Sequence, residues 1–439
     1  MSTKDNKPAL ALPSSRLSRF TKLGSLATRV AGNMLADGVS EFARGNRPKF
    51  KDLLLTPGNV TRVADQLAQM RGAAMKVGQL LSMDAGDLLP PELSTLLVKL
   101  RSDAHAMPEK ELVKLLTQQW GVDWRKRFIQ FPLKPIAAAS IGQVHKVIDD
   151  DLNLLAIKIQ YPGIKQSIDS DVDNVATLIN MTGLLPKKLN LTPLLIEAKK
   201  QLHDEANYVL EGQRLAQYAQ IVADDDAFLM PRLAPALSSD VVLAMTYIEG
   251  KPIEDLQTAP QVLKDKVITD LMRLLFKELF EFNLVQTDPN FANYLFNHDE
   301  QKIVLLDFGA TREFSAGFAQ AYRRLMQAAI AKDKPTIQQA AIEIGLMGSH
   351  VPDHIKQIIT DIAYIACEPL YAQQPYDFAN SGLSARLQKQ GMQIGLDKDY
   401  IHTPPSDAIF LHRKLGGLFL LAIKLKAKVD MAALFKPYQ

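Results

Sequence analysis

The spacing of apolar positions changes along the chain, and these changes mark its predicted parts. Residues 58–120 place apolar residues at helical spacing, whereas residues 130–250 alternate like a sheet that contains a helical insertion. Helical spacing then returns and dominates the remainder of the chain. The pattern predicts an α+β protein with a disordered lead, a helical extension, a sheet-containing part and a helical part, at residues 1–12, 13–125, 126–250 and 251–439.

One predicted helix near the N-terminus, from Arg16 to Met34, is both basic and amphipathic. Its apolar residues recur at helical spacing: Leu17, Phe20, Leu23, Ala27, Val30 and Met34. A helix of this kind can lie in a membrane interface. It can equally dock on the protein's own domains, and the sequence leaves both interpretations open.

Three polar residues in the second half of the chain stand in an informative order. The run QTDPNFANYLF holds Asp288 and, five positions on, Asn293, and a strand-like run then leads into Asp307 of a DFG tripeptide. In protein-kinase-like enzymes this order gives a catalytic-loop aspartate, an asparagine that binds metal, and a metal-binding aspartate. The spacing predicts that Asp288 is catalytic and that Asn293 and Asp307 bind magnesium, a hard cation that prefers oxygen ligands.

An upstream strand-like run, LLAIKIQ, carries Lys158 where kinases have the lysine that contacts the α- and β-phosphates of ATP. A lysine in solvent at the edge of a strand is the structural alternative, but the downstream residues favour the phosphate-binding role. In kinases this lysine pairs with a helical glutamate. The helix expected after Thr192 and Pro193, read as its N-cap and first residue, contains Glu205 and Glu211.

Where a kinase has a glycine-rich loop, this chain has AAASIGQVHKV, in which Gly142 is the only glycine. Alanine restricts the backbone more than glycine does, so we expect a stiffer loop; a small-residue turn without a ligand role is the alternative. The run VVLAMTYIEG is typical of the hinge beneath an adenine ring. Nucleotide contacts are expected from the loop, the lysine and the hinge: Ala137, Ala138, Ala139, Ser140, Lys158, Met245 and Tyr247.

Four motifs together give the chain a resemblance to a known family. They are AAASIGQVH, the K-x-G-Q run with Lys76 and Gln79, the EAN tripeptide with Glu205, and DFG. In this combination the chain resembles the UbiB family of atypical kinase-like proteins, also called the AarF or ABC1-kinase family. The resemblance extends from about residue 12 to the C-terminus, and its N-terminal part is similar to the branch found in mitochondria and many bacteria.

The resemblance implies a two-lobed, protein-kinase-like α+β fold with an N-terminal helical K-x-G-Q extension. It implies binding of ATP or ADP with Mg²⁺, ATPase or small-molecule kinase activity, and a role in ubiquinone (coenzyme Q) biosynthesis at a membrane. Glu211 then matches the partner of Lys158. Lys76 and Gln79 match residues that fold over the active site and meet Glu205, which implies a regulatory role for all three.

The chain departs from the family pattern at three places. Asn207 replaces the second acid of an E-x-D motif, Gln286-Thr287 precede Asp288 where His-Ala is usual, and Ala292 replaces a glycine. None of these changes removes a metal ligand or the lysine. Two alternatives remain open: a nucleotide-binding pseudokinase scaffold for biosynthetic proteins, and a phosphotransferase of the choline or aminoglycoside kinase type, which K-x-G-Q and the alanine-rich loop disfavour.

Composition narrows the expected partners and location. A formal net charge of +3 gives no support for nucleic-acid binding. The longest apolar run, Leu415–Ile423, lies between Lys414 and Lys424 and is too short to span a bilayer. The first ten residues carry neither an apolar signal segment nor an arginine-rich leader. We therefore expect a cytoplasmic protein, peripheral at the inner face of a bacterial membrane.

Within that setting the expected partners are ATP, an anionic membrane surface, an isoprenoid-quinone precursor or lipid, and ubiquinone-biosynthesis proteins.

Overall fold

The computed structural model describes residues 70, 72–74, 76–78, 106–181, 191–396, 402 and 404–439. The chain forms two compact units. The first comprises Met1–Gln213 and Arg232–Tyr247, and the second comprises Arg214–Pro231 and Ile248–Gln439. The predicted boundaries at residues 125 and 250 remain a prediction, and most of the predicted N-terminal extension lies outside the described residues.

The first unit is built on an antiparallel sheet with the strand order β1-β3-β4-β6, to which β2 adds by pairing with β3. Alternation along β4 buries Leu155, Ile157 and Ile159, and Lys158 therefore points to the opposite face of the sheet. The strands are β1 (Phe128–Gln130), β2 (Ala137–Ala138), β3 (Gly142–Asp149), β4 (Leu154–Gln160) and β6 (Val242–Thr246).

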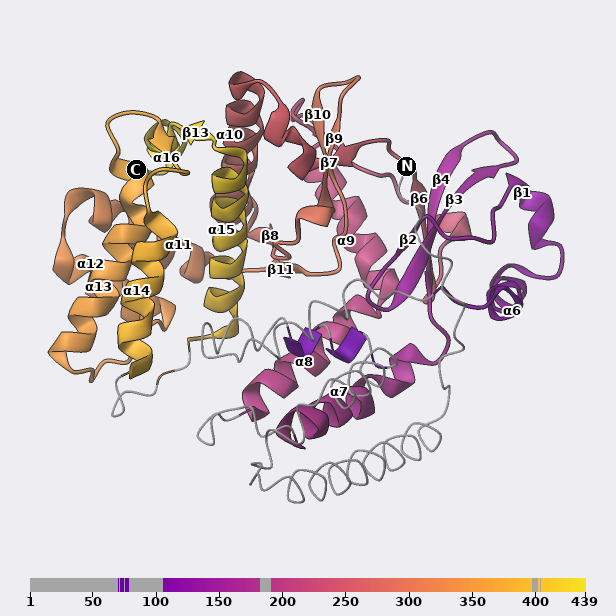
Figure 1. The fold of residues 1–439 in the computed structure, drawn as a ribbon, viewed down its shortest axis with the longest axis horizontal. Helices are drawn as coiled ribbons and strands as arrows, with labels where there is room; N and C mark the ends of the chain where they lie inside the picture. The colour runs from indigo at the N-terminus through magenta and orange to yellow at the C-terminus, as the bar shows by residue number, and fades with distance from the viewer. Residues whose placement is uncertain are drawn as a thin grey trace, which may run out of the picture. The chain divides into compact units, whose positions relative to one another are not determined.

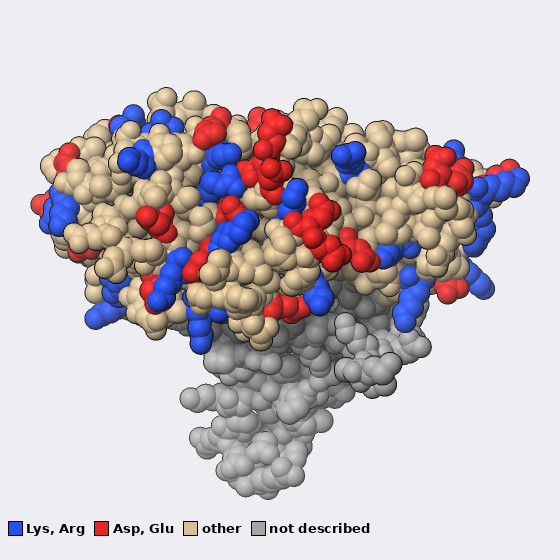
Figure 2. Space-filling view, turned by 90° about the horizontal axis from the view of Figure 1, so that it is seen from above, with Lys and Arg blue, Asp and Glu red and all other residues tan. Residues whose placement is uncertain are grey.

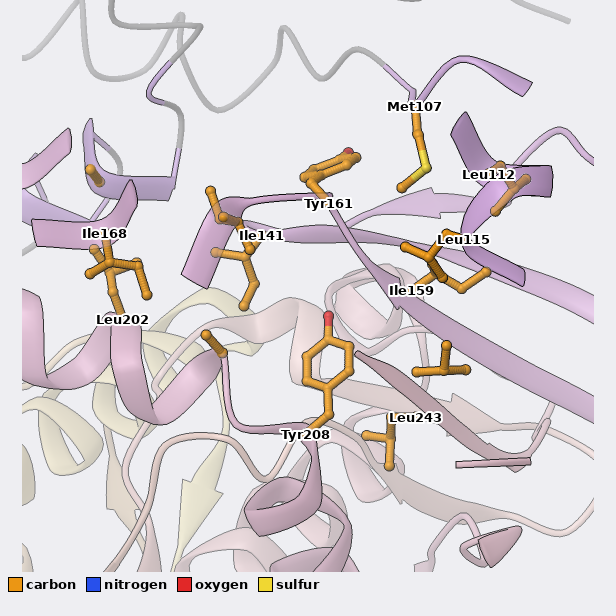
Figure 3. Close-up of a cluster of buried hydrophobic side chains, with 14 of the residues drawn as sticks. Met107, Leu112, Leu115, Ile141, Ile159, Tyr161, Ile168, Leu202, Tyr208 and Leu243 are labelled. Atoms are coloured by element: carbon orange, nitrogen blue, oxygen red, sulfur yellow. The ribbon is translucent and has the colours of Figure 1, made fainter. Parts of the chain in front are cut away.

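Helices cover this sheet through a continuous apolar core. Figure 3 shows Ile159 and Leu243 from the sheet near Tyr208, and Ile168 and Leu202 from two helices beside Ile141. Burial of such side chains contributes about 1.5–3 kcal/mol each. The helices are α6 (Glu109–Trp120), η2 (Trp124–Arg127), α7 (Ile164–Met181), α8 (Thr192–Glu205), the start of α9 (Tyr208–Ile221) and η3 (Pro235–Leu237).

The helix expected after Thr192 is interrupted. Helix α8 ends at Glu205 and α9 begins at Tyr208, because the side chain of Asn207 accepts a hydrogen bond from the Leu210 backbone amide at 3.1 Å and so caps the second helix. Thr192 is the first helical residue and Leu191 occupies the N-cap position, so the predicted cap is one residue out of register.

The second unit combines short strands with many helices (Figure 1). A four-stranded sheet has the order β5-β10-β9-β7, in which β5 and β10 are parallel and the other pairs are antiparallel; β8 pairs with β11 and β12 with β13. The strands are β5 (Phe228–Leu229), β7 (Lys251–Pro252), β8 (Leu284–Gln286), β9 (Tyr294–Asn297), β10 (Lys302–Leu305), β11 (Thr311–Glu313), β12 (Tyr376–Asp377) and β13 (Lys428–Val429).

The helices of the second unit pack around apolar and aromatic side chains, among them Phe276, Phe280, Phe435 and Tyr438. A single π-helical turn, Glu278–Phe282, follows α10 directly. The α-helices are α10 (Gln261–Lys277), α11 (Ala316–Ala331), α12 (Lys334–Ile344), α13 (Asp353–Cys367), α14 (Leu383–Leu396), α15 (Ser406–Leu425) and α16 (Met431–Phe435). The 3-10 turns are η4 (Ile253–Thr258), η6 (Phe291–Asn293), η7 (Glu368–Tyr371) and η8 (Lys436–Tyr438).

The α+β class expected from the sequence is confirmed. None of the helices within the described residues combines the length and apolar content needed to cross a membrane. On the face shown in Figure 2, acidic and basic side chains are interspersed. The mixed charge of this face agrees with the small formal net charge.

Candidate functional site

An ion pair in the first unit joins Lys158 to Glu211. The Lys158 ammonium donates to both carboxylate oxygens of Glu211, at 2.7 and 2.9 Å, and the two side chains are 12% and 3% exposed. Lys158 stands on β4 and Glu211 in the first turn of α9, where a carboxylate is favoured by the helix dipole. The pair therefore holds a cation in a fixed position while leaving it partly accessible.

The alanine-rich segment forms a short hairpin. Ala137 and Ala138 pair with Val144 and Gln143, and the Ala139 amide donates to the Gly142 carbonyl at 2.8 Å. A Cβ on Gly142 would fall against the Ile159 carbonyl oxygen and lie 2.8 Å from the Tyr208 hydroxyl, so only glycine fits there. Backbone hydrogen bonds thus hold the hairpin together, and its greater stiffness stays a prediction.

Glu205, the last residue of α8, connects this hairpin to the K-x-G-Q segment. It forms an ion pair with Lys76 and accepts a hydrogen bond from Ser140 Oγ at 2.9 Å. Lys76 is largely buried, and residues 72–74 and 76–78 are helical. The structure thus brings together Lys76, Ser140 and Glu205, whereas Gln79 lies outside the described residues.

The hinge-like residues lie at the end of β6. Met245 pairs with Ala156 of β4 and forms a bridge with Leu233. The Tyr247 amide donates to the Leu154 carbonyl at 2.8 Å, and the Lys146 ammonium lies 4.2 Å from the centre of the Tyr247 ring. The adenine-binding role of Met245 and Tyr247 stays a prediction.

In the second unit, Asp288 and Asn293 are directly hydrogen-bonded. Asn293 Nδ2 donates to Asp288 Oδ2 at 2.8 Å, and the Asn290 amide donates to Asp288 Oδ1 at 3.3 Å. Because the amide nitrogen of Asn293 is used by Asp288, its Oδ1 oxygen is the atom left to accept or to bind a cation. The hydrogen bond therefore fixes the Asp288 carboxylate and the Asn293 amide oxygen relative to each other in the loop between β8 and β9.

Asp307 occupies an unusual backbone conformation, with φ of 57° in the left-handed region. Aspartate and asparagine tolerate this region better than most residues, and such conformations concentrate at functional sites. Its Oδ1 accepts from the Gly309 amide at 3.0 Å, and the neighbouring Leu306 amide donates to the Asn293 carbonyl at 2.8 Å. The side chain is exposed, so the carboxylate is presented to solvent beside the Asp288 loop.

These donors fit a magnesium ion that is shared with a ligand. Within the described residues, no group of three or more His, Cys, Asp or Glu side chains is arranged to hold a metal ion alone. Magnesium in phosphoryl-transfer sites usually takes one or two carboxylates and completes its octahedron with phosphate oxygens and water. Asn293 and Asp307 supply protein ligands of that kind.

A buried polar network contacts both ends of the loop between β8 and β9, and the sequence did not predict it. Lys414 of α15, 3% exposed, donates to Gln286 Oε1 at 2.9 Å and to the Tyr294 hydroxyl at 2.7 Å, and its nitrogen lies 3.8 Å from Glu278 Oε2. Glu278 also accepts from the Tyr218 hydroxyl and from the Gln286 amide. In the sequence, the one hint of this role is that Lys414 stands at the start of an apolar run.

The groups of this network shift the pKa values of one another. Burial alone would lower the pKa of Lys414, but the nearby Glu278, Tyr294 and Asp288 outweigh burial and raise that pKa above its ordinary value. Burial raises the pKa of Glu278, and Lys414 acts in the opposite direction. Lys414 is therefore a buried cation that interacts electrostatically with Asp288.

The order and geometry of these residues define a protein-kinase-like chain, and comparison with known proteins gives the family. The sequence profile of the ABC1 atypical kinase-like domain matches residues 99–341. The chain belongs to the ABC1 atypical kinase-like family, as the motifs indicated, and the expected two-lobed kinase-like fold is confirmed.

Two relatives extend over nearly the whole chain. "Atypical kinase COQ8, mitochondrial" of Saccharomyces cerevisiae is 36% identical over 99% of this chain and 86% of its own length. "Atypical kinase COQ8B, mitochondrial" of Rattus norvegicus is 33% identical over 97% of this chain and 80% of its own. Both names say mitochondrial, so these relatives lend no support to the expected bacterial location.

A solved structure, the Rv3197–erythromycin complex of Mycobacterium tuberculosis, covers 95% of this chain and 97% of its own with a TM-score of 0.59. At 21% identity this likeness shows the fold.

Proposed function

We propose that this chain is an ATP-dependent atypical kinase or ATPase that supports coenzyme Q biosynthesis at a membrane surface. The observation that carries the proposal is the arrangement of Asp288, Asn293 and Asp307: a carboxylate bonded to an amide, and a second carboxylate held in the left-handed backbone region. Membership of the ABC1 family and the COQ8 relatives support the assignment to coenzyme Q.

Each residue has a separate role in the proposed chemistry. Magnesium bound with ATP would supply positive charge to neutralise the charge that develops on the phosphates during transfer. Asn293 and Asp307 hold it, and Asp288 orients the attacking hydroxyl of a small molecule or of water. Lys158, oriented by Glu211, binds the α- and β-phosphates. Catalysis then comes mainly from positioning and electrostatic stabilisation.

The pseudokinase alternative draws its main support from Gln286, which stands where the family usually has histidine. In the structure Gln286 is buried and its side chain bonds to Lys414, Tyr294 and the Asp307 carbonyl. These contacts give Gln286 a structural role. The ABC1 family match also weighs against a choline or aminoglycoside kinase.

Magnesium-dependent release of phosphate from ATP tests the proposal, and vesicles test its membrane part. We expect turnover that requires Mg²⁺ and rises when vesicles containing anionic lipid are added, with the protein sedimenting on them at low salt. Deleting residues 1–38 should weaken sedimentation, because it removes the basic amphipathic segment from Arg16 to Met34, which lies outside the described residues.

Neutral vesicles are the control for nonspecific adsorption. Nucleotide binding without any turnover, in the presence and absence of vesicles, would instead favour the pseudokinase scaffold. Turnover together with a protein that stays in the supernatant would show that the N-terminal segment is a docked structural helix.

The cluster of Lys76, Glu205 and Ser140 predicts coupling between the K-x-G-Q segment and the alanine-rich hairpin. Lys76→Ala removes the cation from Glu205 and leaves the bond between Glu205 and Ser140 in place. We expect Lys76→Ala and Glu205→Gln each to change ATP turnover, and the double variant to change it no further, because both break one interaction. Steady-state kinetics of the three variants measure this.

The matched control is Lys200→Ala, an exposed lysine of the same helix as Glu205. Additive effects in the double variant would show that the ion pair does not act as a unit. If all variants turn over ATP at the parent rate, the cluster has no regulatory role.

A further inference from the structure

Helix α15 contacts residues that flank the candidate catalytic residues of the second unit, at several points. Figure 1 shows α15 running beside β8 and β11, the strands that precede Asp288 and follow Asp307. Contacts with these two strands and with the loop after β8 come from one stretch of the helix, between Asp407 and Gly417. A single helix is therefore in contact with both of the segments that carry the proposed magnesium ligands.

Lys414 makes the polar contacts. Through Gln286 it reaches the residue two positions before Asp288, and through Tyr294 the residue directly after Asn293. Gln286 in turn donates from Nε2 to the Asp307 carbonyl at 3.3 Å. The buried ammonium is thus joined by short hydrogen-bonded paths to the backbone beside all three proposed catalytic and metal-binding residues.

Gly417, one helical turn after Lys414, makes the close backbone contact. A Cβ built on Gly417 would fall against the Cβ of Pro289 and lie 3.2 Å from its Cα and 3.3 Å from its carbonyl oxygen. Pro289 directly follows Asp288, and its ring restricts the backbone. Only glycine at position 417 lets the helix approach the loop this closely.

A third contact fixes the start of the helix to the segment after Asp307. The Arg312 guanidinium of β11 lies 3.5 Å from Asp407 Oδ1 and 4.1 Å from the centre of the Phe410 ring. Asp407 and Phe410 belong to the first turns of α15. The start of the helix is therefore held to the strand that follows Asp307.

We propose that Lys414 and Gly417 of α15 are positioning residues that set the geometry of Asp288, Asn293 and Asp307. The proposal rests on the proposed function for its catalytic consequence, but the placement of the loop can be measured independently. Neither residue is assigned a contact with nucleotide. Their role is to hold the loop from Gln286 to Asn293 and the Asp307 carbonyl in one arrangement.

The chain supplies a matched pair of substitutions to test this. Gly416→Ala and Gly417→Ala add the same methyl group to adjacent positions of one helix, but a Cβ on Gly416 meets nothing within 4 Å. Alanine raises helix propensity equally at both positions. Any difference between the two variants therefore reports the contact with Pro289.

We expect Gly417→Ala to lower kcat by roughly 10- to 100-fold, because a displacement of about 1 Å at a reacting group costs up to that much. KM for ATP should change little if the loop is displaced while the phosphate-binding lysine is not. Gly416→Ala should retain the parent kcat within about twofold, as substitutions on open surface usually do.

Hydrogen exchange gives a readout that does not depend on activity. The amides of Asn290, Ala292 and Asn293 are each hydrogen-bonded within the loop. They should exchange faster in Gly417→Ala and at the parent rate in Gly416→Ala, while β10 stays equally protected in both. Equal exchange of the loop in the two variants would overturn the positioning role.

Lys414 is tested by a pair of substitutions, because removing the lysine alone leaves Glu278 buried without its cation. Lys414→Met with Glu278→Gln should fold and should show the same loss of kcat and the same faster exchange in the loop. If the parent protein has no turnover, only the proposed function is contradicted, because hydrogen exchange still tests the positioning role. Parent-like kcat and exchange in this double variant would show that Lys414 is only a core residue.

Discussion

Asp307→Asn should abolish magnesium-dependent nucleotide binding while leaving the fold intact. The substitution is mild for the structure, because asparagine keeps the Oδ1 that accepts from Gly309 and tolerates the left-handed backbone at φ 57°. It removes the negative charge that a hard cation requires. The loss should therefore appear in binding and turnover and not in folding.

Thermal unfolding with and without Mg²⁺ and ADP measures this. A ligand at about 100 times its Kd stabilises a protein by ~2.7 kcal/mol, which corresponds to roughly 5–10 °C for a domain of about 200 residues. We expect that shift in the parent and in Asp299→Asn, a control in the exposed turn between β9 and β10, and none in Asp307→Asn. A full shift of the unfolding temperature in Asp307→Asn would show that Asp307 is not a metal ligand.

Replacing Lys158 should have two separable effects, one on stability and one on activity. Lys158→Met takes from the buried carboxylate of Glu211, 3% exposed, the cation that bonds to both of its oxygens. Breaking a buried ion pair in this way destabilises by roughly 3–5 kcal/mol. Lys158→Met with Glu211→Leu replaces the whole pair by apolar side chains of similar size and should recover most of that loss.

The double variant should nevertheless remain inactive, because it restores packing but not the cation for the phosphates. We expect its turnover to be lower than the parent's by roughly 10²–10³-fold, the usual cost of removing a preorganised electrostatic contact. Lys165→Met, on the exposed face of α7, is the control for loss of a lysine. A double variant with both parent stability and parent turnover would show that Lys158 is structural.

The parts of the fold and site that the sequence predicted are those encoded by local spacing. The run LLAIKIQ predicted a strand that carries Lys158, which β4 confirms, and the order of Asp288, Asn293 and Asp307 indicated the kinase-like family that the comparison confirms. The break between α8 and α9 was missed, because Asn207 was weighed only as a missing acid, and its capping of α9 was not considered.

Contacts between distant segments could not be predicted in the same way. Lys414 meets residues 128 and 120 positions away, and Gly417 meets Pro289 from a different element. In the sequence Lys414 is only a charge at the end of an apolar run, and nothing local distinguishes Gly417 from Gly416. Such residues become visible only when the fold places α15 against the loop after β8.

A crystal structure with Mg²⁺ and a non-hydrolysable ATP analogue tests the central claim most directly. We expect one magnesium ion bound by Asp307 and the Oδ1 of Asn293 at about 2.1 Å, with the Lys158 ammonium about 2.8 Å from an α- or β-phosphate oxygen. Nucleotide bound elsewhere, or bound without metal contacts from Asn293 and Asp307, would contradict the proposed site.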